Sequence, residues 1–158
     1  MKRLGNLYTL VGRTANRLLR PVFVKLTGGS TRVRALIVSD TQEVLLVRSW
    51  LGYQQWGLPG GGIKPAEPAA TAASREVFEE TGVIVPPSKF ALLGSFTNND
   101  STAPFTVTCL MAASEKRPTH VVWYRRHEIL AAAWFPLAAL PPDRSKNVDE
   151  ALRLAGHA

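Results

Sequence analysis

The chain has 158 residues, of which 46% are hydrophobic and 20% are charged, a size and composition that suit one domain with a buried core and exclude a collagen-like or disordered chain. Its formal net charge of +7 is unevenly placed, since eight of the 19 Lys and Arg residues lie within residues 1–39 and the other 11 nearly balance the 12 Asp and Glu residues. No apolar run reaches about 18 residues and Cys109 is the only cysteine, which excludes a membrane-spanning helix and an intrachain disulfide.

Residues 1–30 form a basic leader, and residues 31–158 form the expected domain. Apolar side chains recur in the leader at helical spacing with arginines between them, which predicts an imperfect basic amphipathic helix. Gly12 and Arg13 interrupt the apolar centre that a secretory signal needs. Three interpretations stay open: a helix docked on its own domain or on a partner, peripheral membrane contact through residues 1–20, and a targeting or disordered segment.

Two strands joined by a short turn open the expected domain. In Thr31–Ser39 apolar residues alternate with Arg32 and Arg34, a period of two that predicts a strand. Asp40–Glu43 has the composition of a turn, and Val44–Arg48 is a second apolar run. The two strands are therefore expected to form a hairpin.

A glycine-rich loop and a helix come next. Leu58–Gly62 contains three consecutive glycines, which no regular element absorbs. Ala69–Glu80 consists mostly of good helix formers, with Pro68 suited to the first turn and Gly82 to a left-handed cap at the end.

The last third of the chain mixes strands with one more helix. Further strands are expected at Ala91–Phe96, Thr106–Ala113, Val121–Tyr124 and, briefly, Trp134–Phe135. A final helix is expected over Asn147–Ala155, buried through Val148, Leu152 and Ala155. Because strands and helices are interleaved, the sequence predicts an α/β fold with helices on the faces of a sheet.

Three carboxylates lie within the helix that follows the glycine loop. At about 100° per residue, Glu79 and Glu80 fall roughly 60° and 40° to either side of Glu76, so the three share one face. Like charges at this spacing repel by a few tenths of a kcal/mol per pair, on the order of 0.2–0.5. Taken alone, such a cluster is better explained as an ordinary solvated helix face, although a divalent cation would offset the repulsion.

The spacing of the loop and the helix resembles the Nudix box of the Nudix hydrolase family. The match holds at all nine positions that define the box: Gly61, Glu67, Arg75, Glu76, Val77, Glu79, Glu80, Gly82 and Val83. The approach from Trp56 to Gly60 and the later segment from Trp134 to Leu137 also resemble family members. The resemblance covers about residues 31–140, and the basic leader lies outside it.

The resemblance implies a Nudix-type α/β/α sandwich around a mixed β-sheet. It also implies that Glu76, Glu79 and Glu80 bind Mg²⁺ or Mn²⁺, together with a backbone carbonyl at Gly60. Metal ions neutralise the anionic oxygens of a diphosphate and make a bound water a better nucleophile. A metal-dependent attack on a phosphoanhydride is therefore expected.

The remaining box residues are expected to support the site. By resemblance, Arg75 orients a catalytic glutamate through a salt bridge, and Glu67 supports the loop geometry together with Gly61 and Gly82. Family members differ in where the general base lies. Glu79 is the first candidate and Glu128 is the second, since Glu128 lies six residues before Trp134, where some members carry such a glutamate on a loop.

Residues outside the box are candidates for binding substrate. Arg48 ends a strand that should lead toward the site and is a candidate for a substrate phosphate, whereas Arg34 is a poorer candidate. Trp56 is a candidate for stacking on a base. Three further aromatic residues have the same potential but are more often packing residues: Phe96, Trp123 and Tyr124.

These observations together predict a cytoplasmic, divalent-metal-dependent hydrolase of a nucleoside diphosphate derivative or nucleoside triphosphate. Its expected partner is a phosphorylated small molecule, with a nucleotide favoured. Formation of a homodimer is left as an open alternative. Three alternatives are an RNA 5′-end hydrolase whose leader grips the backbone, a lipid-linked diphosphate hydrolase, and a non-catalytic nucleotide-sensing domain. The retained glutamates of the box argue against the last.

Overall fold

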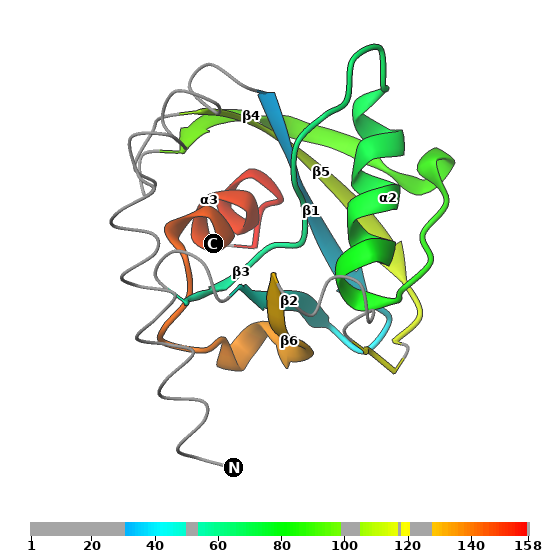
Figure 1. Ribbon diagram of the computed structural model, residues 1–158. Helices are drawn as coiled ribbons and strands as arrows, with labels where there is room; N and C mark the ends of the chain where they lie inside the picture. The colour runs from blue at the N-terminus through cyan, green and yellow to red at the C-terminus, as the bar shows by residue number, and fades with distance from the viewer. Residues whose placement is uncertain (1–30, 50–53, 99–104, 117, 121–127, 158) are drawn as a thin grey trace.

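The computed structural model describes residues 31–49, 54–98, 105–116, 118–120 and 128–157 (Figure 1). In them the strands form one six-stranded sheet of order β3-β2-β1-β5-β4, with β6 paired to β2. The strands are β1 (Thr31–Ser39), β2 (Glu43–Ser49), β3 (Trp56–Gly57), β4 (Ala91–Asn98), β5 (Phe105–Ser114) and β6 (Ile129–Pro136). The helices are α2 (Ala69–Thr81) and α3 (Lys146–Leu154), with short 3-10 turns η1 (Pro87–Lys89) and η3 (Leu137–Ala139).

The sheet is mixed, as expected. Strand β1 pairs antiparallel with β2 beside their shared turn, at Val38 and Val44, which confirms the hairpin. On its other side β1 pairs parallel with β5 from end to end. Strand β4 pairs antiparallel with β5, and both β3 and β6 pair antiparallel with β2.

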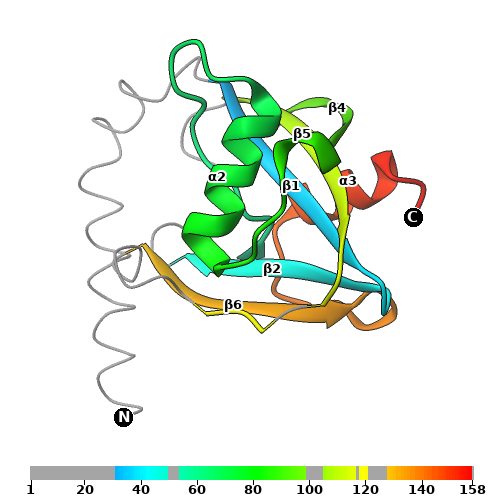
Figure 2. The same ribbon diagram turned by 90° about the vertical axis from the view of Figure 1, so that its right-hand side faces the viewer.

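One helix covers each face of the sheet, which confirms the α/β/α sandwich (Figures 1 and 2). Residues of α2 and the β1 side chains Val33, Ala35 and Ile37 form one buried cluster. The alternate β1 side chains, Leu36 and Val38, pack in a second cluster with residues of α3. Because both faces of β1 are covered from Ala35 onward, this strand is more deeply buried than its alternating sequence predicts.

The glycine-rich stretch pairs with the part of β1 that is not paired with β2. Val33 N donates to Gly61 O and Ala35 N donates to Pro59 O, each at 2.9 Å. The stretch therefore runs along the free part of β1, where β2 no longer reaches. The sequence predicted an irregular loop here, and it did not reveal that the loop backbone continues the sheet.

Several element boundaries differ from the expected ones. Pro68 is the N-cap of α2, with an extended backbone at φ −62° and ψ 142°, and does not lie in the first turn. Strand β6 is longer than Trp134–Phe135 because it pairs with β2 along its length. Gly82 takes the expected left-handed conformation, with φ 74°.

The last helix begins one residue earlier than expected. The Ser145 side chain accepts a hydrogen bond from Asn147 N and caps the helix. Val148 and Leu152 are buried as expected, and Ala151 is buried as well. Ala155 is the C-cap and is only partly buried, so its expected burial was wrong. The expected strand at Val121–Tyr124 and the basic leader lie outside the described residues. None of the described helices is long and apolar enough to span a membrane.

Candidate active site

Arg75 connects the helix α2 to the loop that precedes it. Its Nε donates to Glu67 Oε1 at 2.8 Å and its Nη2 donates to Glu67 Oε2 at 2.9 Å, a bidentate pair. Nη2 also donates to Gly62 O at 3.1 Å, and Lys64 N donates to Glu67 Oε2 at 2.9 Å. Arg75 therefore joins both Gly62 and Glu67 of the loop to the helix, and the supporting role of Glu67 stays a prediction.

The same arginine also reaches the acidic face of the helix. Its Nη1 donates to Glu76 Oε1 at 2.6 Å and lies 3.6 Å from Glu79 Oε2. The hydrogen bond with Glu67 is the largest of the effects that raise the pKa of Arg75. The structure thus brings Arg75 together with two candidate metal ligands, and its role in orienting a catalytic glutamate stays a prediction.

The Glu67 carboxyl group gives the site a measurable pH dependence. Hydrogen bonds from Arg75 and then from Lys64 N lower the pKa of Glu67 from 4.5 to about 2. A carboxyl group with a lowered folded-state pKa stabilises the fold above its unfolded pKa, and this contribution is lost as the pH falls toward the folded value. The window for Glu67 is therefore about pH 4.5 down to about pH 2.

We expect Glu67→Gln to reduce the acid sensitivity of folding. Between pH 6 and pH 3 the wild-type protein should lose more of its melting temperature than the variant. Glu43 and Glu150 also have lowered pKa values, but they contribute to both proteins alike, so the difference isolates Glu67. Thermal unfolding followed by circular dichroism measures it. Equal losses in the two proteins would show that the Glu67–Arg75 pair does not stabilise the loop.

The consecutive glycines let the loop lie against both β1 and α2. A Cβ at Gly60, where φ is 147°, would overlap the carbonyl oxygen of Val33 in β1. A Cβ at Gly61 would lie 2.5 Å from Glu76 Oε1. In addition, Gly60 N donates to Glu80 Oε2 at 2.9 Å. The loop is therefore held between the sheet and two carboxylates of the helix.

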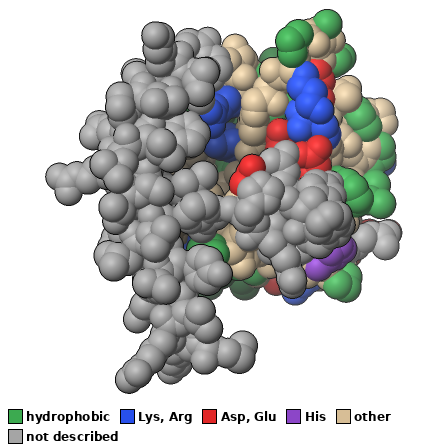
Figure 3. All heavy atoms as spheres, viewed as in Figure 1, with side chains coloured by type: hydrophobic (Ala, Val, Ile, Leu, Met, Phe, Trp, Pro, Cys, Tyr) green, Lys and Arg blue, Asp and Glu red, His purple; other side chains and the backbone are tan. Residues whose placement is uncertain are grey.

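The three helix carboxylates border this loop with different exposure. Glu76 and Glu80 are buried, whereas the Glu79 side chain is 18% exposed. In Figure 3 acidic (red) and basic (blue) side chains lie beside one another over the region of α2. A tan strip of backbone and uncharged polar side chains separates them from a second group of basic side chains. Glu79 is therefore the box carboxylate best placed to meet a water molecule.

The donor set fits a hard divalent cation. Among the described residues no group of three or more His, Cys, Asp or Glu side chains lies close enough to hold a metal ion. Arg75 explains this, because it pairs with Glu76 and Glu79. Mg²⁺ needs only one or two carboxylates, since waters and substrate phosphates complete its octahedron. The acidic face beside the loop meets that requirement.

Arg48 and Trp56 have contacts of their own on the edge of the sheet. Arg48 forms an ion pair with Asp143, donates from Nε to Gln54 O at 2.6 Å, and lies 5.5 Å from the centre of the Trp56 ring. Trp56 packs edge-on against Phe135 at 4.8 Å. Both residues therefore have a structural role, and their binding of substrate stays a prediction.

Other candidates fall at the margin of the site or outside it. Glu128 directly precedes β6, and its carbonyl accepts a hydrogen bond from Ser49 Oγ at 3.0 Å. Phe96 packs against the cluster on the α3 face. Trp123 and Tyr124 lie outside the described residues. The role of Glu128 as a base stays a prediction.

Arg34 lies nearer the box than the sequence suggested. Desolvation by burial lowers the pKa of its guanidinium, and the nearby charges of Glu80 and Glu76 offset this only in part. Arg32 is two residues away on the same strand. The local signal for this pair was the arginine alternation in β1, but only the fold shows that it borders the glycine loop.

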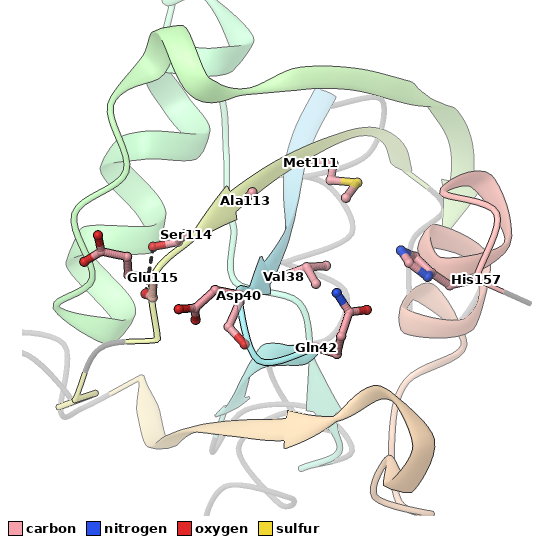
Figure 4. Close-up of a pocket in the computed structure, with 9 residues that line it drawn as sticks. Val38, Asp40, Gln42, Met111, Ala113, Ser114, Glu115 and His157 are labelled. Carbon is pink, nitrogen blue, oxygen red and sulfur yellow. Dashed lines mark hydrogen bonds between the residues drawn. The ribbon is translucent and has the colours of Figure 1, made fainter.

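A pocket of about 470 Å³ lies elsewhere on the molecule (Figure 4). Val38 and Met111 line its centre, Asp40 and Glu115 lie toward one side, and His157 lies on the other. None of its lining residues belongs to the box. The convergence of charged residues at the glycine loop, rather than this pocket, defines the candidate active site.

Comparison with known proteins identifies a family whose domain covers most of the chain. A family model described as the NUDIX domain matches residues 30–154. Diphosphoinositol polyphosphate phosphohydrolase 2 of Rattus norvegicus is 50% identical over 58 residues, which cover 37% of this chain and 31% of that protein. The m7GpppN-mRNA hydrolase dcap-2 of Caenorhabditis elegans is 30% identical over 116 residues, covering 72% of this chain but 14% of that protein. The chain thus spans less than a third of the length of these curated relatives.

Solved structures show the same architecture. A MutT NUDIX hydrolase from Burkholderia pseudomallei has a TM-score of 0.69 and 25% identity, covering 80% of this chain and 97% of that one. The NUDIX domain of Shewanella oneidensis NrtR, complexed with ADP ribose, has a TM-score of 0.64 and 23% identity, covering 82% of this chain and 87% of that one. The likeness in fold therefore extends well beyond the box helix.

Proposed function

This chain belongs to the NUDIX family, and on that premise we propose that it is a divalent-metal-dependent pyrophosphohydrolase. Its proposed reaction is cleavage of a phosphoanhydride bond in a nucleoside diphosphate derivative, a nucleoside triphosphate or a related phosphorylated small molecule. The observation that carries the proposal is the arrangement of Glu76, Glu79 and Glu80 beside the glycine loop, with Arg75 paired to two of them.

Glu76, Glu79, Glu80 and the Gly60 carbonyl would hold Mg²⁺ or Mn²⁺. When bound, the ion neutralises charge on the anhydride oxygens and lowers the pKa of a coordinated water. Arg75 holds Glu76 and Glu79 through the contacts described above, and Gly60 N holds Glu80.

Glu79 is the proposed general base because it is the most exposed box carboxylate and still lies near Arg75. The water oxygen forms a bond to phosphorus while the water proton passes to Glu79. The bond from that phosphorus to the bridging oxygen breaks, and its electron pair leaves with the second phosphate product. Glu128, which directly precedes β6, is the second candidate for this role.

A second candidate function is hydrolysis at the 5′ end of RNA. The match to the mRNA hydrolase extends over 116 residues, which is longer than the 58-residue match to the diphosphoinositol polyphosphate phosphohydrolase. The basic leader supplies charge suited to an RNA backbone. Salt-sensitive RNA binding that is lost when residues 1–30 are removed would favour this function over hydrolysis of a small molecule.

The test is a substrate panel with Mg²⁺ or Mn²⁺. It contains nucleoside triphosphates, nucleotide sugars, ADP-ribose, dinucleoside polyphosphates, a diphosphoinositol polyphosphate and capped RNA, and product release is followed by chromatography. We expect hydrolysis of at least one class, abolished by EDTA and restored by excess Mg²⁺. A folded protein that is inactive on the whole panel with either metal would contradict the proposal.

A further inference from the structure

Two arginines of β1, Arg32 and Arg34, flank the glycine loop on the side away from the helix. Being two residues apart, they project from the same face of the strand. Arg32 forms an isolated bridge with Gly62, and a Cβ at Gly60 would lie 3.1 Å from Arg34 Cα. The loop therefore runs between a pair of cations on β1 and the carboxylates of α2.

The placement of these two arginines destabilises the fold. Desolvation by burial lowers the pKa of both guanidinium groups, and for Arg32 the charge of Arg34 is the second cause. The Arg32 Nε is buried and has no hydrogen-bond partner in the structure. Buried donors are ordinarily satisfied, and an unsatisfied one destabilises the fold. The described residues offer only partial compensation.

That compensation comes from a ring and from distant charges. The Arg32 guanidinium lies 4.6 Å from the centre of the Phe105 ring, and Glu76 is the acidic group that acts on it. Arg34 donates from Nη1 to Val33 O at 3.1 Å, within its own strand. Neither arginine has a carboxylate at ion-pair distance among the described residues. The pair retains positive charge that can bind an anion.

We propose that Arg32 and Arg34 form an anion-binding subsite for a phosphoryl group of the substrate that is not part of the cleaved anhydride bond. A terminal phosphoryl group carries a charge of about −1.5 to −2 at neutral pH, which two guanidinium groups match. The subsite would favour multiply phosphorylated substrates over diphosphates that carry neutral groups at both ends. This inference rests on the proposed function and names the substrate class of that site.

A purely structural role predicts a different response to mutation. If Arg32 served to stabilise the fold, its loss would lower the melting temperature. If Arg32 is instead a partly buried cation that binds an anion, a hydrophobic residue of similar length should leave the melting temperature unchanged or raise it. We therefore expect Arg32→Met to retain the melting temperature while it weakens anion binding.

Metal-free binding separates this inference from catalysis. Inorganic tripolyphosphate is titrated into the full chain by calorimetry in EDTA at constant ionic strength. The variants are Arg32→Met, Arg34→Met and, as the matched control, Arg153→Met, which removes an exposed arginine of α3 paired with Glu150. We expect at least tenfold weaker binding for the two β1 variants, about 1.4 kcal/mol, and no change for the control.

Turnover provides a second measurement. Arg32→Met should lower the ratio of kcat/KM for a nucleoside triphosphate to kcat/KM for ADP-ribose by about tenfold. Wild-type affinity and selectivity in this variant, or a fall in melting temperature without a change in binding, would overturn the subsite. Inactivity of the wild-type protein on every substrate, with intact tripolyphosphate binding, would instead overturn the proposed function and leave the anion site standing.

Discussion

Glu79→Gln is expected to lower kcat by about 10²–10⁴-fold, the range typical of losing a positioned general base. The amide is close to the carboxylate in size, so no cavity forms, and the side chain is 18% exposed. Stability should therefore change by no more than about 0.5 kcal/mol. Steady-state kinetics on the preferred substrate, together with urea unfolding, measure the two effects separately.

Glu150→Gln is the matched control for this substitution. Glu150 is also a helical glutamate paired with an arginine, Arg153, but it lies on α3 across the sheet from the box. Its replacement should leave kcat within about twofold of the wild type. If Glu79→Gln retained near-normal turnover while Glu128→Gln lost it, the base would be assigned to Glu128 and the role proposed for Glu79 would be wrong.

The local elements were predictable because their signals are local. Alternation of apolar residues predicted β1, and helix formers ending at Gly82 predicted α2, whose left-handed cap the structure confirms. The common face of Glu76, Glu79 and Glu80 follows from helical geometry alone. Periodicity and capping thus predicted the elements that carry the candidate site.

Contacts between distant residues were not predictable in the same way. Asp143, the partner of Arg48, lies 95 residues away, and no period in the sequence connects the two. The position of Arg34 near Glu76 and Glu80 likewise depends on how β1, the loop and α2 pack together. The residues that surround the box are therefore the part of the site for which a structure is needed.

The glycine loop shows both a local sequence signal and contacts that depend on the fold. Its composition marks it in the sequence, but Gly60 and Gly61 are required by different neighbours in space. A Cβ at Gly60 would overlap the backbone of β1, and a Cβ at Gly61 would overlap the Glu76 carboxylate. A Cβ at Gly62 would meet nothing within 4 Å. The three positions therefore differ in their tolerance of a side chain, although they look alike in the sequence.

Gly61→Ala should lower kcat/KM by about 10²-fold, the effect of displacing a catalytic group by about 1 Å. Its Cβ would lie 2.5–2.8 Å from the carboxylate atoms of Glu76, so that side chain must swing away from Arg75. The fold should survive, because the end of a side chain can move where a backbone cannot. Gly62→Ala in the same loop is the matched control and should stay near wild type. Comparable activity of the two variants would show that Glu76 does not need its present position for catalysis.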